Sequence, residues 1–198
     1  MQDALKNTIE HAMGKARDMI LGGDEVLRVF FAIDKDGSAN VVVAPATGDD
    51  EDNNLIPYLR MMFAILGVRS YCMMSEVWMS RRATREGPRP SEDPDRIEAL
   101  VAFGVERITD DTGKTQTMMR MASAQITRDP TAVAAIEWSE PSTRLESKWA
   151  TLLPPPGMPE CPDVPGAMKM LQEMGEQFGI TGVSMTPGME RPAGASVH

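Results

Sequence analysis

Two apolar runs, VRSYCMMSEVWMS at residues 68–80 and IEALVAFGVERIT at residues 97–109, enclose the charged stretch RRATREGPRPSEDPDR. Both runs have the apolar, β-branched and aromatic character of β-strands. The stretch between them holds three prolines and one glycine, which favour a turn or loop. Because short connections join neighbouring strands, we expect the two runs to pair in antiparallel fashion.

Further helices and strands are predicted on both sides of this pair. Apolar stripes at spacings of three and four residues predict helices over residues 3–21 and 54–66, ended by Gly22-Gly23 and by Gly67. The order of elements predicts an α+β fold, a two-layer sandwich in which an antiparallel sheet of five to six strands carries two amphipathic helices on one face. The predicted strands lie at residues 25–34, 41–46, 68–80, 97–109 and 114–127, with a weaker one at 132–138.

The composition of the chain changes at residue 154. Eight of the fifteen prolines follow residue 153. We therefore expect an α+β domain over residues 1–153 and an extended, Pro/Gly-rich tail over residues 154–198. Helical spacing of Met168, Leu171, Met174 and Phe178 predicts one short helix within the tail.

Charge and composition argue against several classes of partner. The chain of 198 residues has a net charge of −9 and a pI of about 4.8, so nucleic acid and anionic membranes are poor partners. No apolar run approaches the ~20 residues that a membrane span needs. Cys72 and Cys161 suggest free thiols rather than a disulfide framework. A cytoplasmic location is the resulting prediction.

The chain lacks the usual motifs for a cofactor or a metal ion. Neither G-x-x-x-x-G-K-[ST] nor G-x-G-x-x-G occurs, and the only histidines are His11 and His198. No histidine or cysteine pair with zinc-ligand spacing can be assembled from these residues. We predict no cofactor and no metal site.

Residues 80–98 hold five arginines and five carboxylates, with most arginines in the first half and most acids in the second. Two interpretations stay open. Opposite charges on the two arms of a hairpin would favour correct strand pairing. Alternatively, the arginines would bind an acidic protein surface or a phosphate. The candidate partner-binding residues are Trp78, Arg81, Arg82, Arg85, Arg89 and Arg96.

A carboxylate cluster is the other candidate site. Glu76 lies in an apolar strand beside Val77 and Trp78, so it either faces solvent or is buried and paired. A buried Glu76 would need an arginine, and the nearest in sequence are Arg81, Arg82, Arg85 and Arg96. If the protein is an enzyme, its candidate catalytic residues are Glu76, Asp95 and Glu98.

One part of the sequence resembles a pattern found in small uncharacterised proteins of bacteria and their phages. A strand ending in E-x-W-M is followed by the turn P-S-x-x-P-D-R-x-E, over roughly residues 68–110 or about a fifth of the chain. The resemblance implies a bacterial or phage setting and no particular reaction. It also implies that Glu76, Trp78, Asp95, Arg96 and Glu98 form one linked cluster at the end of the sheet, where Arg96 would pair with Glu76 or Glu98.

Two hypotheses for function follow. The first is a non-enzymatic binding or assembly protein, whose candidate forms are a phage-encoded virion component and a host-directed factor. It would dock a protein partner, or a second copy of itself, through the charged hairpin, a sheet edge or the C-terminal tail. The second is a Mg²⁺-dependent hydrolase or nuclease-like enzyme that uses the carboxylate cluster.

Overall fold

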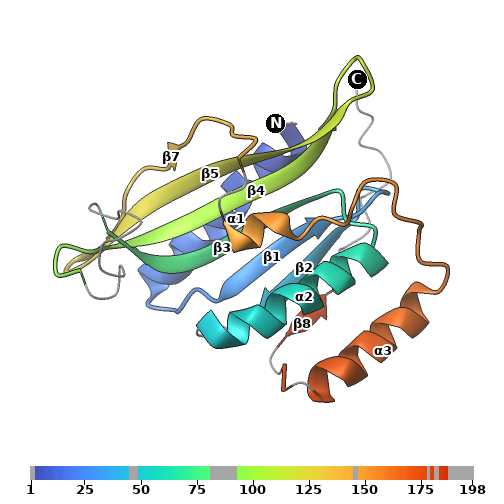
Figure 1. Ribbon diagram of the computed structural model, residues 1–198. Coiled ribbons are helices and arrows are strands. Elements are labelled where there is room, and N and C mark those ends of the chain that lie inside the picture. The colour runs from blue at the N-terminus through green and yellow to red at the C-terminus, as the bar shows by residue number, and fades with distance from the viewer. Residues whose placement is uncertain are drawn as a thin grey trace, which may run out of the picture.

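A computed structural model of the chain describes residues 3–44, 49–80, 93–144, 147–177, 179–180 and 183–186. All the strands that it describes form one antiparallel sheet in the order β6-β5-β4-β3-β1-β2-β8, with β7 paired to β5 (Figure 1). The elements, in chain order, are α1 (Asp3–Gly22), β1 (Arg28–Ile33), β2 (Ala39–Ala44), α2 (Asp49–Ile65), β3 (Ser70–Met79), β4 (Ile97–Thr109), β5 (Thr115–Arg128), β6 (Thr131–Val133), β7 (Glu137–Trp138), η2 (Lys148–Thr151), α3 (Val164–Gln177) and β8 (Ser184–Thr186).

The centre of the sheet is the predicted pair of apolar strands. β3 and β4 pair in antiparallel register from Ser70 opposite Glu106 to Met79 opposite Ile97. Residues 71–75 of β3 and residues 99–106 of β4 are buried without a break. Because successive side chains of a strand point to opposite faces, such unbroken burial means that both faces of the sheet are covered here.

The helices supply this cover from opposite sides (Figure 1). α1 packs on β3, β4 and β6, where its apolar stripe shares a buried cluster with Cys72 and Leu100. α2, η2 and α3 contribute to the cluster on the other face, with Tyr71 and Phe103. The α+β class and the antiparallel sheet are confirmed.

Two details of the predicted architecture were wrong. The two predicted helices do not share one face, because strands that are apolar on both sides need a helix on each side. The sheet also has eight strands in the described residues rather than five to six. The weaker strand predicted at 132–138 is two strands, β6 and β7, of three and two residues, and β8 adds three residues from the predicted tail. Such strands are too short for a period of two to be recognised.

The two long helices end where the sequence predicts. After α1, Gly23 has φ of 86°, and its N–H donates to the Ile20 carbonyl while Asp24 N–H donates to the Met19 carbonyl. Gly67 has φ of 63° and ends α2 in the same arrangement. A positive φ is easily reached only by glycine, so these two residues fix the helix ends.

The segment after β7 returns to the core through η2. Trp149 is buried there, and its ring centre lies 5.9 Å from that of Phe30 on β1. The buried Tyr71 hydroxyl on β3 donates to the Trp149 carbonyl and accepts from Leu152 N–H at 3.4 Å. Arg60 Nε on α2 donates to the Thr151 carbonyl at 3.0 Å. These contacts fix the start of the proline-rich region on the sheet.

Part of the predicted tail is built into the fold. The short helix that the spacing predicts is present as α3, which packs on α2 and buries Leu171. β8 extends the sheet by pairing with residues 41–43 of β2. Residues 187–198 lie outside the described part of the chain.

The close packing of α1 on β4 leads to a prediction about Gly104. A Cβ at this position would lie 2.6 Å from Ile9 Cδ1 and 3.0 Å from Leu5 Cδ2, whereas a Cβ at Gly14 would have no atom within 4 Å. We expect Gly104→Ala to lower the free energy of unfolding by about 1–2 kcal/mol through overpacking. Gly14→Ala, the matched control, should leave it unchanged or raise it by up to about 1 kcal/mol. Urea denaturation measures the free energy of unfolding of both variants. Equal changes in Gly104→Ala and Gly14→Ala would contradict the close packing of α1 on Gly104.

Candidate functional site

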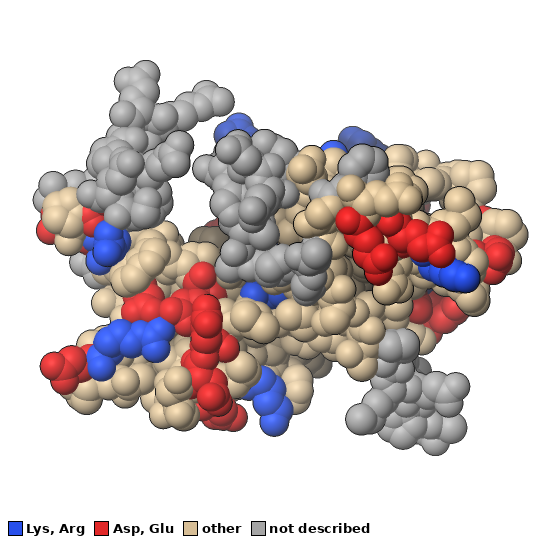
Figure 2. All heavy atoms as spheres, turned by 90° about the horizontal axis from the view of Figure 1, so that it is seen from below, with Lys and Arg blue, Asp and Glu red and all other residues tan. Residues whose placement is uncertain are grey.

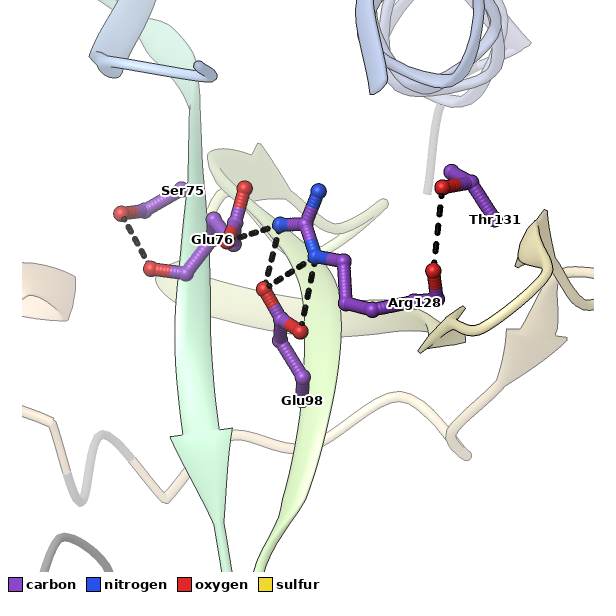
Figure 3. Close-up of polar contacts among 5 residues, drawn as sticks. All are labelled: Ser75, Glu76, Glu98, Arg128 and Thr131. Carbon is purple, nitrogen blue, oxygen red and sulfur yellow. Dashed lines mark hydrogen bonds and ion pairs between the residues drawn. The ribbon is translucent and has the colours of Figure 1, made fainter. Parts of the chain in front are cut away.

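Glu76, Glu98 and Arg128 converge at one end of the sheet, as Figure 3 shows. They come from β3, β4 and β5, each two positions beyond a residue that is buried under α1. Because side chains two apart on a strand share a face, all three belong to the face that α1 covers. The cluster therefore lies where the cover of that face ends and polar side chains begin.

Arg128 holds both carboxylates. Its Nε lies 3.0 and 2.9 Å from the two carboxylate oxygens of Glu98. Its Nη2 donates to Glu76 Oε1 at 2.6 Å and also to Glu98 Oε1. The side chain of Arg128 is 45% exposed, against 22% for Glu76 and 11% for Glu98. The planar guanidinium thus bridges the two carboxylates, although its single positive charge balances only one of them.

The two carboxyl groups have different environments. The hydrogen bonds from Arg128 are the main cause that lowers the pKa of Glu98. Burial, followed by the neighbouring Glu98, raises the pKa of Glu76. Glu76 Oε2 is buried and has no hydrogen-bond partner in the part of the chain that the structure describes. Glu98 is therefore the ionised partner of Arg128, and ionised Glu76 is the less stable member of the cluster.

Asp95, the third candidate catalytic residue, is exposed on the turn that precedes β4. Its N–H donates to Asp93 Oδ1 at 2.9 Å, and Ser80 Oγ donates to Asp93 Oδ2. Among the described residues, no group of three or more His, Cys, Asp or Glu side chains is arranged to hold a metal ion. The structure thus joins Glu76 and Glu98, and gives the Asp95 backbone a role in the turn.

Trp78 and Arg96 form the second part of this end of the sheet. Arg96 Cζ lies 4.6 Å from the centre of the Trp78 ring. Trp78 pairs with Glu98 in the β3–β4 register, and 47% of the residue is exposed. The stacked pair fixes the orientation of an exposed tryptophan on a rigid strand.

The linked cluster implied by the resemblance has a different arginine at its centre. Arg96 was predicted to pair with Glu76 or Glu98, but Arg128 makes that pair and Arg96 stacks on Trp78. Candidate partner-binding residues outside the described part of the chain are Arg81, Arg82, Arg85 and Arg89.

The register of the β4–β5 hairpin could have identified Arg128. The turn DDTG places Thr109 opposite Thr115 and therefore Glu98 opposite Ile126. Arg128 is then the diagonal neighbour of Glu98 on the same face, within reach of a long side chain. A search limited to arginines near Glu76 in the sequence does not include it.

Comparisons of the chain with known protein families, with curated proteins and with solved structures found no match. In the described residues, no helix combines the length and apolarity needed to cross a bilayer.

The asymmetry of the carboxyl pair gives a prediction about stability and pH. A lowered folded-state pKa means that Glu98 stabilises the fold above its unfolded pKa, and that this contribution is lost as the pH falls through the folded value. The pKa of Glu76 is raised in the folded state, so its effect on stability is the opposite: ionisation of Glu76 at neutral pH lowers the free energy of unfolding. At pH 7, Glu98→Gln should lower the free energy of unfolding by about 1 kcal/mol, whereas Glu76→Gln should leave it unchanged or raise it.

Urea denaturation of both variants at pH 7 and pH 3 tests these opposite effects of Glu98 and Glu76 on the free energy of unfolding. The difference between the two variants should shrink at pH 3, where both carboxyl groups of the wild type take up protons. If Glu76→Gln destabilises the fold as much as Glu98→Gln at pH 7, Glu98 is not the distinct ionised partner of Arg128, and the assignment is contradicted.

Proposed function

We propose that the protein is a non-enzymatic binding protein that docks a protein partner at the Trp78 end of its sheet. The observation that carries this proposal is the exposed Trp78 ring with Arg96 stacked on it. Tryptophan and arginine are the residues most enriched at energetically important positions of protein interfaces. Because Trp78 lies in β3 and Arg96 stacks on it from the turn directly before β4, little side-chain freedom is lost on binding.

Charge supports a protein partner over nucleic acid. Residues 81–89, which follow β3 directly, add four arginines in the sequence. Figure 2 views another face of the molecule, where described acidic side chains form groups with basic ones beside them and make no continuous basic surface. A local concentration of arginine on an acidic protein suits an acidic patch on a partner protein.

The alternative, a Mg²⁺-dependent hydrolase or nuclease-like enzyme, has weaker support. Its carboxylates are already bound to Arg128, and a metal ion would have to displace the guanidinium from Glu76 and Glu98. Such a site needs carboxylate oxygens that face an open coordination position. The bacterial or phage setting, a virion or host-directed role and a cytoplasmic location stay predictions from the sequence.

Replacing the stacked pair tests the docking proposal. Trp78→Ala and Arg96→Ala should each weaken binding to the partner about tenfold or more, because hot-spot truncations have effects of about 2 kcal/mol. Met170→Ala, which removes a 65% exposed side chain from α3, is the matched control and should bind like the wild type. The partner would be isolated with immobilised wild-type protein and its affinity for all variants measured by calorimetry.

Self-association is the other form of the proposal, and light scattering of the wild type and Trp78→Ala would show it as a change in molar mass. A partner that binds wild type and Trp78→Ala equally would contradict this docking site. Thermal stabilisation by Mg²⁺ that Glu76→Gln abolishes would favour the enzyme instead.

A further inference from the structure

A cavity of about 390 Å³ opens at the other end of the sheet, away from Glu76 and Glu98. One wall is the proline segment, residues 154–160. The opposite walls come from the end of α2, the β1–β2 turn and the last residues of β4. In Figure 1 these parts meet at the right-hand end of the molecule, near the end of α2. The volume lies within the range of small-molecule sites.

Three cationic side chains line this cavity: Lys35, Arg69 and Arg107. Among the described residues that line it, Glu160 is the only carboxylate, and Asp36 is a further acidic neighbour of Lys35. Arg107 N–H donates to the Arg69 carbonyl at 3.3 Å, so the two arginines are neighbours across β3 and β4, and burial and the charge of Arg69 lower the pKa of Arg107. Positive charge therefore exceeds negative charge in a concave and partly dry site.

Arg107 has an unused donor at this site. Its Nη2 donates to the Pro154 carbonyl, whereas its Nε is buried and has no hydrogen-bond partner among the described residues. A buried donor without a partner is unfavourable, so an acceptor placed in the cavity would be stabilised.

Glu160 shows how an anion can be held here. Its carboxylate accepts a hydrogen bond from Lys35 Nζ and also interacts with the charge of Arg69. The pair is exposed, with 68% of the Glu160 side chain and 37% of the Lys35 side chain accessible. Exposed ion pairs are weak, so a ligand with more charge can replace Glu160 at Lys35.

The proline segment makes the cavity preformed. It begins two residues after Leu152, which is buried and whose N–H donates to the Tyr71 hydroxyl. Met158 N–H donates to the Pro155 carbonyl at 3.3 Å, which closes a turn within the segment. Prolines have few conformations to lose, so a wall made of them needs little ordering when a ligand binds.

We propose that this cavity binds a small organic phosphate, with its phosphate group held by Arg69 and Arg107 and contacted by Lys35 in place of Glu160. Paired guanidinium groups match the geometry and the double charge of a phosphate monoester. Val68, Met158 and the prolines offer apolar contacts to its organic part. This site is independent of the protein-docking end, and either proposal can fail without the other.

Titration with phenyl phosphate, monitored by calorimetry and by amide chemical shifts, tests the site. We expect saturable binding that is tighter than that of inorganic phosphate and absent for neutral phenol, with shifts centred on Gly67 and Gly157. Arg69→Met and Arg107→Met should each weaken binding about tenfold. Lys169→Met removes the same charge from exposed α3 and should have little effect. Arg69 is exposed, so its variant tests the site even if Arg107→Met does not fold.

Glu160→Gln provides the sharpest test, because it should tighten binding several-fold by removing the internal competitor. Its matched control is Glu173→Gln on α3, which makes the same change of charge and should leave the affinity unchanged. Absence of saturable binding, or equal weakening by Arg69→Met and Lys169→Met, would overturn the proposal. An unchanged affinity in Glu160→Gln would overturn the replacement of Glu160 by the ligand.

Discussion

Burial of the central strands on both faces is the constraint on which the rest of the structure depends. The β3–β4 pair is apolar through its whole middle, so each face must be covered by a helix that brings its own apolar stripe. α1 covers one face, and α2 covers the other together with η2 and α3. The C-terminal region joins the fold because this second face needs more cover than α2 alone provides.

The same constraint places polar chemistry at the two ends of the sheet. Side chains on the middle of β3 and β4 have no access to solvent, so charged groups on these strands gather where the helical cover stops. At one end, Arg128 bridges two glutamates and a stacked Trp78 remains exposed. At the other end, Arg107 and Arg69 line a cavity that has prolines as one wall. The first arrangement suits docking of a protein, and the second suits capture of a small anion.

The sequence predicts the features that local chemistry decides, and it fails where distant residues meet. Helix ends at Gly23 and Gly67 follow from backbone conformation alone, and the long strands follow from composition. The prediction of both helices on one face was wrong, because an unbroken apolar run indicates a strand that is buried on both faces of the sheet. Arg128 was missed because its partner Glu76 lies 52 positions away, and only the register of three strands brings them together. The cationic cavity likewise combines four separate segments.

Methyl nuclear Overhauser spectroscopy tests the central claim, helices on opposite faces of one sheet, most directly. Ile9 Cδ1 of α1 packs against Gly104, whereas the ring centre of Phe63 on α2 lies 5.2 Å from that of Tyr71 on the other face. We predict cross-peaks from the Ile9 methyl groups to Gly104, cross-peaks between the rings of Phe63 and Tyr71, and none between the methyl groups of Ile9 and Leu59. Direct cross-peaks between α1 and α2 methyl groups would place both helices on one face and contradict the account.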